Sequence, residues 1–499
     1  MAGMMHSLRR WLVFLLALSA CLVRGQDAGM VLRYSVGYNT QRASLPLTED
    51  QRKEAGRLDQ QARRETAAGR FGEALRRYHE GTAVMRGVPW TPAVELASSL
   101  QGRLDRAMVE PGHQITVSLS PLYPIERAAE EKLGAAVFLV PAAGGEQRNL
   151  PPPAPVDPAR LPFTTKITVP ETASGDYFVQ VRLTLGDGSA PERLIAAFVK
   201  NLPLHIEPLS GEAERLRIRL ANSTGPDAPA FPTAQYPLER YQQSDRGAAS
   251  PIGYDFRGQF ADAHAILDAL KAGRDPFAGK SGGLRKAYRS PVDQTVQPYR
   301  LFIPAQYDGT RLAPLLVALH GMGGDENSML DGYQGALKTE AQRLGFIVAC
   351  PKGRDSASMY RGSAEQDVLD VVAEVRRDFR IDAARIYVMG HSMGGFGSWS
   401  IAMARPDLFA ALGPIAGGGN PEAMAKIRHI PQYVVHGDND KTVNVDFSRR
   451  MVEAGKKAGA TIVYVEVPGG GHNEIAAPQF GPMFDFFAKQ SRSAGPGKD

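Results

Sequence analysis

Cysteine is almost missing from this sequence of 499 residues, which contains only Cys21 and Cys350. Two cysteines exclude a disulfide framework and a zinc site built from cysteines. Cys350 stands in an apolar run, so we expect it to be a small buried hydrophobic residue. An excess of one charge is also missing, since 58 Lys and Arg oppose 53 Asp and Glu, for a formal net charge of +5. This near balance argues against a partner made of nucleic acid.

Long hydrophobic runs are confined to the first 25 residues, which predict a signal peptide. Arg9 and Arg10 precede the apolar region 11–18, and the apolar stretch ends at Arg24, short of the ~20 residues of a membrane-spanning helix. Residues 18–21 resemble a bacterial lipobox, which would leave a lipidated Cys21 as a membrane tether. Residues 23–25 instead resemble an ordinary signal-peptidase site, and we favour the soluble product that it gives. Both alternatives predict an exported protein, periplasmic or secreted.

The remaining composition is that of a globular protein, with 43% hydrophobic, 8% aromatic and 22% charged residues. It excludes a disordered or collagen-like chain, and the length predicts two to four domains. Apolar residues at helical spacing predict a helical N-terminal segment over 26–104. Short β-branched runs between Pro and Gly turns predict an immunoglobulin-like β-sandwich over 105–205, with another small all-β module as the alternative. Helical spacing returns over 206–285, which we interpret as a helical bridge.

Strands and helices alternate from residue 286 to residue 490. Several strands, such as 315–319, are apolar at every position, which is typical of a sheet buried on both faces. The helices between them show an apolar face, clearest over 368–379. This alternation predicts an α/β domain with a mostly parallel sheet covered by helices on both sides.

The sharpest motif in that domain is Gly390-His-Ser392-Met-Gly394, between a predicted strand and a predicted helix. A nucleophilic serine needs a tight, strained turn with flanking glycines, so that the neighbouring backbone can approach closely. Ser392 would then project its hydroxyl at the carboxyl edge of the sheet, close to the positive end of a helix dipole. The motif therefore predicts that Ser392 is a catalytic nucleophile.

A serine hydroxyl needs a base that is oriented by an acid, in the chain order Ser, Asp or Glu, His. His472 is the histidine that follows the candidate acids, and it comes directly after the last predicted strand. Asp438 and Asp440 compete for the acid position in one loop after another strand, and we choose Asp440. His391 belongs to the serine turn and should point away from Ser392, and we interpret His436 as structural.

The glycine-rich loop His320-Gly-Met322-Gly-Gly follows the strand that precedes the first helix of the domain. This is where an amide of an oxyanion hole is expected, because glycines let the backbone turn an N–H toward the oxyanion. We predict that the amides of Met322 and Met393 form this pair of donors. No phosphate loop, dinucleotide motif or zinc motif is present, so the sequence implies neither a cofactor nor a metal.

With these motifs in place, residues 283–488 resemble the α/β-hydrolase superfamily of serine hydrolases. The chain is similar to the polyhydroxybutyrate-depolymerase and feruloyl-esterase group, the carboxylesterase and phospholipase group, and the prolyl-oligopeptidase catalytic domain. The run from His436 to Val443 resembles the acid loop of these enzymes and supports Asp440, although Asn444 stands where proline is frequent. The resemblance implies a carboxylic ester hydrolase acting on a small or polymer-linked ester.

Two alternatives remain open. One is a peptidase of the prolyl-oligopeptidase type, although residues before 285 contain no blade-length repeats of a propeller. The other is a cell-surface binding module whose hydrolase domain is vestigial. The motifs name neither the acyl group nor the alcohol, and they predict no substrate-binding residue and no oligomeric state.

Overall fold

The computed structural model describes residues 27–125, 133–150, 152–223 and 225–492. The predicted signal peptide and the predicted lipidation site at Cys21 lie outside the described residues. None of the helices in these described ranges is both long and apolar enough to cross a membrane.

The chain folds into two compact units that interleave in sequence. The first unit extends to Glu207 and also contains Asp245–Ile252. The second contains Pro208–Ser244 and the chain from Gly253 onward.

The first unit begins with helices that surround a small core of their own. Tyr38, Leu75 and Tyr78 are buried in it. The side chains and backbones of Thr48 and Gln51 bond reciprocally in a capping box, which fixes where the second helix begins. The predicted helical segment 26–104 ends earlier than expected, because residues from Leu100 pair with a strand of the following sheet. The helices are α2 (Ala28–Ser44), α3 (Glu49–Ala67), α4 (Phe71–Arg86) and α5 (Pro92–Ser99).

The rest of the first unit consists of two β-sheets with a shared apolar core, and a short helix, α6 (Ile195–Phe198). One sheet has the order β1-β3-β7, and the other has the order β2-β9-β8-β4-β5 with β6 beside β4. Val117 from the first sheet and Val179 from the second are both fully buried in that core. The strands are β1 (Leu100–Leu104), β2 (Met108–Val109), β3 (Gln114–Pro121), β4 (Leu133–Pro141), β5 (Arg148–Asn149), β6 (Ala154–Val156), β7 (Phe163–Thr168), β8 (Gly175–Thr184) and β9 (Val199–Ile206).

The second unit contains the three helices that we expected to form a bridge, so they belong to the unit that holds the large sheet. They are α7 (Ser210–Ala221), α8 (Phe231–Asp245) and α9 (Phe256–Lys271). The buried hydroxyl of Thr233 accepts a hydrogen bond from the amide of Ala287 at 2.9 Å and lies 3.2 Å from its carbonyl oxygen. This pairing joins α8 to the first strand of the sheet, which explains why 206–285 is not a separate segment.

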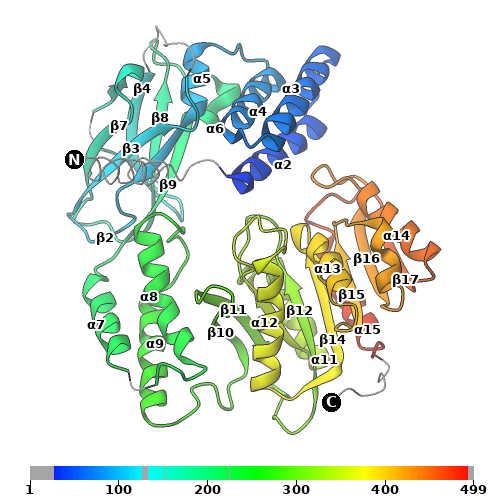
Figure 1. Ribbon diagram of the computed structural model, residues 1–499. Coiled ribbons are helices and arrows are strands. Elements are labelled where there is room, and N and C mark those ends of the chain that lie inside the picture. Colours follow the sequence, from blue (N-terminus) through cyan, green and yellow to red (C-terminus); the bar gives the residue numbers. More distant parts are fainter. Residues whose placement is uncertain (1–26, 126–132, 151, 224, 493–499) are drawn as a thin grey trace, which may run out of the picture. The chain divides into compact units, whose positions relative to one another are not determined.

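That sheet has eight strands in the order β10-β11-β13-β12-β14-β15-β16-β17 (Figure 1). The pairs β10–β11 and β11–β13 are antiparallel and all others are parallel, which confirms the predicted mostly parallel sheet. This topology is the α/β-hydrolase fold. The strands are β10 (Gly282–Arg289), β11 (Val296–Ile303), β12 (Ala313–Leu319), β13 (Ile347–Pro351), β14 (Ile381–His391), β15 (Ala411–Ile415), β16 (Gln432–Gly437) and β17 (Ile462–Val467).

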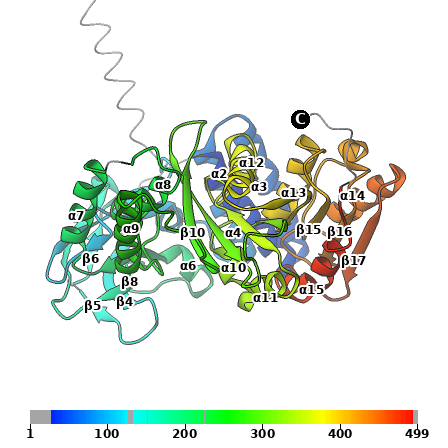
Figure 2. The same cartoon turned by 90° about the horizontal axis from the view of Figure 1, so that it is seen from below.

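Helices cover both faces of the sheet, because central strands such as β12 are apolar at every position and successive side chains point to opposite faces. Leu315, Val317 and Leu319 of β12 face the core on one side, and Leu316 and Ala318 face the core on the other. Helices α12, α13 and α14 cover the first side and α10, α11 and α15 the second (Figure 2). They are α10 (Ser328–Asp331), α11 (Ala336–Leu344), α12 (Ser363–Asp378), α13 (Met393–Ala404), α14 (Asp446–Lys457) and α15 (Ala476–Phe487). Cys350 is 1% exposed within the second core, as predicted.

Candidate active site

Ser392 stands alone between the end of β14 and the start of α13. Its backbone has φ 58° and ψ −116°, a conformation that residues with a side chain rarely adopt. A Cβ atom on Gly394 would overlap the carbonyl oxygen of Leu319, so the turn can pack against β12 only with glycine there. The local sequence therefore produces the strained strand–turn–helix that a nucleophilic serine requires.

Asp440 and His472 meet at the same edge of the sheet. The Oδ2 atom of Asp440 lies 2.6 Å from Nδ1 of His472, in the loop that follows β17. The Oδ1 atom accepts hydrogen bonds from the amides of Thr442 at 2.8 Å and Val443 at 2.9 Å. The carboxylate is thus fixed by its own loop and directs one oxygen at the imidazole.

The environment of Asp440 favours its ionised form. Burial alone would raise the pKa of this carboxyl group, but the hydrogen bonds from His436 and His472 outweigh burial and hold it well below its usual value. The competing residue, Asp438, is exposed, and its Oδ1 accepts a hydrogen bond from the amide of Gly469 at 2.7 Å. The two aspartates therefore occupy different environments, and only Asp440 contacts His472.

His391 contacts the backbone of His472, a role that the sequence did not predict. Its Nε2 atom lies 2.8 Å from the carbonyl oxygen of His472, and its Nδ1 atom lies 3.0 Å from the hydroxyl of Tyr333. Because a carbonyl only accepts, Nε2 carries the proton and Nδ1 accepts from the tyrosine. Burial, with a smaller contribution from His472, lowers the pKa of His391 to about 4. The ring is therefore neutral at pH 7.

His436 packs behind Asp440 and is fully buried. Its Nε2 atom lies 2.9 Å from the carbonyl oxygen of Val443 and 3.3 Å from Oδ2 of Asp440. Its Nδ1 atom lies 2.7 Å from the hydroxyl of Ser448 at the start of α14. The interpretation of His436 as structural understated its position, because it touches the same carboxylate oxygen as His472.

The loop after β12 runs alongside the serine turn. A Cβ atom on Gly321 would lie 3.4 Å from Cβ of Ser392, so the backbone of this loop passes next to that side chain. The amide of Gly323 donates to the carbonyl of Ser356 at 2.8 Å, and both ring nitrogens of His320 lie 2.8 Å from backbone carbonyls. Met322 lies in this fixed loop. Met393 is the first residue of α13, where amides have no acceptor within the helix.

These contacts bring the predicted residues into one region. Asp440 and His472 are in direct contact, and the ring centroids of His391 and His472 are 4.8 Å apart, which places His472 beside the residue that precedes Ser392. Sequence reasoning missed the contacts of His391, His436 and Tyr333; the adjacency of the two histidines to the motifs was the signal available. Within the described residues, no set of three or more His, Cys, Asp or Glu side chains is arranged to hold a metal ion.

Comparison with known proteins gives a match to one family model and similarity to individual esterase sequences. A model of the prolyl oligopeptidase family matches residues 357–433, which include Ser392 and end before Asp440. The chain is 30% identical over 135 residues to the bifunctional acetylxylan esterase/xylanase XynS20E of Neocallimastix patriciarum, covering 26% of this chain and 20% of that protein. It is 29% identical over 153 residues to the probable feruloyl esterase C of Aspergillus terreus, covering 30% of this chain and 56% of that protein. The chain thus spans less than two-thirds of either relative.

Solved structures of esterases also align with this chain. A thermostable esterase aligns with 78% of this chain and all of its own, at 17% identity and a TM-score of 0.41. A ferulic acid esterase from Anaeromyces mucronatus, in complex with ferulic acid, aligns with 43% of this chain and 92% of its own, at 19% identity and a TM-score of 0.36. The family match and the sequence relatives confirm the predicted resemblance to esterases of the α/β-hydrolase superfamily.

Proposed function

We propose that the protein is an exported serine hydrolase that cleaves carboxylic esters through an acyl-enzyme intermediate on Ser392. The observation that carries the proposal is the 2.6 Å contact between Asp440 and His472. It lies at the edge of the sheet where Ser392 leaves β14 in a strained turn. A nucleophile, a base and an orienting acid in this chain order are what acyl transfer in this fold requires.

Each residue has a defined part in the acylation step. The Nε2 atom of His472 takes the proton of Ser392 as its hydroxyl oxygen attacks the ester carbonyl carbon. Asp440 accepts the Nδ1–H of His472 and stabilises the imidazolium that forms. The amides of Met322 and Met393 donate to the oxyanion, and one such donor is typically worth ~10²–10³ in turnover.

Collapse of the tetrahedral intermediate forms the acyl-enzyme, which water then hydrolyses. The carbon–oxygen bond to the alcohol breaks, and the imidazolium of His472 gives its proton to that leaving oxygen. Water then enters, His472 takes one of its protons, and the hydroxide adds to the acyl carbon. Ser392 leaves with the proton from His472, and the carboxylic acid is released.

The relatives support an ester carried by a polymer as the substrate. Their names describe a feruloyl esterase and an acetylxylan esterase, which are enzymes that release an acyl group from an ester. We extend this chemistry to the present chain as its substrate class. Export follows from the predicted signal peptide over 1–25, with a soluble product favoured over a tether at a lipidated Cys21.

A second candidate is a serine peptidase, favoured by the match of residues 357–433 to the prolyl oligopeptidase family. The same Ser392, Asp440 and His472 would then act on a peptide bond. A cell-surface binding module with a vestigial hydrolase domain is a third candidate, and the contact between Asp440 and His472 argues against it.

The test combines labelling with a substrate panel. A fluorophosphonate probe should label the purified protein at Ser392 and should fail to label Ser392→Ala. The panel contains p-nitrophenyl esters of increasing chain length, a feruloyl ester, acetylated xylan and a prolyl anilide. Ester turnover that disappears in Ser392→Ala supports the proposal. Turnover of the anilide alone would favour the peptidase, and an unlabelled protein without turnover would favour the binding module.

A further inference from the structure

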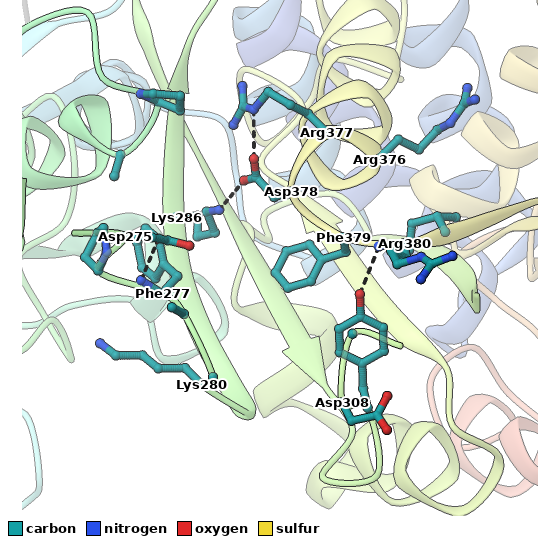
Figure 3. A pocket seen from close by; sticks show the side chains of 18 of the residues that line it. Asp275, Phe277, Lys280, Lys286, Asp308, Arg376, Arg377, Asp378, Phe379 and Arg380 are labelled. Carbon is teal, nitrogen blue, oxygen red and sulfur yellow. Dashed lines mark hydrogen bonds and ion pairs between the residues drawn. The ribbon is translucent and has the colours of Figure 1, made fainter. Parts of the chain in front are cut away.

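A pocket lies at the opposite edge of the sheet from Ser392. It has a volume of about 980 Å³ and is lined where α12 ends at Asp378 and β14 begins at Ile381 (Figure 3). Ser392 follows the other end of β14, 11 residues further along the strand. At about 3.3 Å per residue, the two locations are roughly 36 Å apart along the strand. The volume is within the usual range of small-molecule sites, and the catalytic mechanism above leaves the pocket without a role.

A buried lysine lies in the wall of this pocket. Lys286 of β10 is 5% exposed, and its ammonium nitrogen donates to Oδ2 of Asp378 at 2.6 Å. The same nitrogen lies 4.5 Å from the ring centroid of Phe277 and 5.7 Å from that of Phe379. Asp378 uses one of the three ammonium protons. A charged donor held between two aromatic rings is a built feature and not a mobile surface side chain.

The other charged side chains of the lining make the pocket cationic. Arg377 shares Asp378 with Lys286, whereas Arg380 donates to the neutral carbonyl of Thr310 at 2.9 Å. In the described part of the chain, Lys280, Arg376 and Arg380 form no ion pair with a carboxylate. The remaining acids, Asp275 and Asp308, accept hydrogen bonds from backbone amides two residues further on.

Aromatic side chains supply the apolar part of the lining. Phe277, Phe379 and Tyr307 come from three different segments of the second unit, and Figure 3 shows the two phenylalanines on either side of Lys286. Flat rings of this kind stack against other flat or sugar rings, and guanidinium and ammonium groups bind carboxylates. The lining therefore combines two recognition elements in one pocket.

We infer that this pocket is a second, non-catalytic binding site for a carboxylate that is carried on a ring. The chemistry is shared by two sources: a uronic acid unit of a polysaccharide and an aromatic acid such as ferulic acid. In either case the ring of the ligand lies against Phe277 or Phe379. Its carboxylate is bound by Lys286 and by the cations Lys280, Arg376 and Arg380. The inference does not depend on the hydrolase chemistry of Ser392.

Calorimetric titration of the full-length protein tests it, with four probes: glucuronate, ferulate, glucose and acetate. We expect glucuronate or ferulate to bind, and glucose (a ring without charge) and acetate (a charge without a ring) to bind at least 10-fold more weakly. The preferred one of the first two identifies the source. Equal binding of glucose or acetate would overturn the inference, because either the cationic side chains or the aromatic rings would then contribute nothing to binding.

Variants locate the binding. Lys280→Glu combined with Arg376→Glu should weaken binding of the preferred acid at least 10-fold. Lys457→Glu should leave binding of the acid unchanged. Lys457, like Arg376, is exposed and lies in the last turn of a helix, here α14, so this variant controls for the loss of charge at a helix end. If the double variant melts at a lower temperature, Arg376→Gln alone serves in its place. Binding that survives these substitutions places the acid elsewhere, the catalytic site included, and overturns the inference.

Discussion

The imidazole of His391 anchors the backbone of His472, with 2.8 Å between Nε2 of the first residue and the carbonyl oxygen of the second. His391 directly precedes Ser392 in sequence. The residue before the proposed nucleophile thus fixes the main chain of the proposed base, and Tyr333 in turn fixes the ring of His391.

Removal of this anchor should slow turnover more than it weakens binding. In His391→Ala the loop of His472 loses its contact with the serine turn, and a displacement of 1 Å at a catalytic group can cost about 10²-fold in rate. We therefore expect kcat to fall by about that factor with KM nearly unchanged. Tyr333→Phe keeps the ring of His391 and removes one hydrogen bond, so its loss should be smaller. Steady-state kinetics on a p-nitrophenyl ester measures kcat and KM of both variants. An equal loss of kcat in His391→Ala and Tyr333→Phe would contradict the anchoring role.

Asp440→Asn should nearly abolish turnover, whereas Asp438→Asn should be tolerated. Without the carboxylate, His472 loses the group that fixes its tautomer, which in a serine protease costs about 10⁴ in kcat. The Oδ1 atom of Asp438 accepts a hydrogen bond from the amide of Gly469, and asparagine keeps an acceptor oxygen there, so this substitution should cost less than about 1 kcal/mol of stability. Kinetics and thermal melting of both variants separate the effects. If Asp438→Asn is the inactive variant, the acid has been assigned to the wrong residue.

His391 should make the protein less stable in acid. Burial lowers its pKa to about 4 from 6.5 in the unfolded chain, so the unfolded state binds more protons between these pH values. Stability therefore falls as the pH drops from about 7 to about 4, by about 3 kcal/mol for this group. His391→Gln keeps a side-chain donor but does not titrate. Its melting temperature should depend less on pH over this interval than that of the wild type, and an identical dependence would refute the argument.

Gly394→Ala should strongly destabilise the second unit. The added methyl group overlaps the backbone carbonyl of Leu319, which cannot move without shifting β12, so we expect a cost of about 3 kcal/mol. Gly37→Ala is the control, because nothing lies within 4 Å of the added methyl group and the position is inside helix α2. That variant should gain about 0.5–1 kcal/mol. Chemical denaturation of both variants gives the comparison.

Much of the second unit could be predicted because its strands and helices have local signatures. The apolar strand 315–319 indicated burial on both faces, and the structure has it between two helical layers. The strand order could not be read in this way. Arg300 of β11 pairs with Cys350 of β13, 50 residues away, and such a pairing depends on tertiary packing and not on periodicity. For the same reason the sequence did not predict β10, an edge strand that contains three charged residues and two glycines.

In the candidate site, too, residues in local motifs could be predicted and contacts that depend on tertiary packing could not. Ser392, Asp440 and His472 stand in motifs whose spacing follows from the chemistry, so the sequence was enough to propose them. The contacts of His391 and His436 depend on side-chain orientation across several loops. The pocket beside Lys286 is assembled from five other stretches of the chain, and no single stretch of sequence carries its pattern.

The backbone of Ser392 sets a limit on how stable this protein can be. A residue with a side chain at φ 58° and ψ −116° carries a strain of about 1–3 kcal/mol, which glycine would largely relieve. Ser392→Gly should therefore melt at a higher temperature than the wild type while being inactive. As long as activity is selected, Ser392 cannot be replaced. Any gain in thermal stability must therefore come from substitutions at other positions. The strain at Ser392 is thus retained because the proposed reaction needs the side chain at this position.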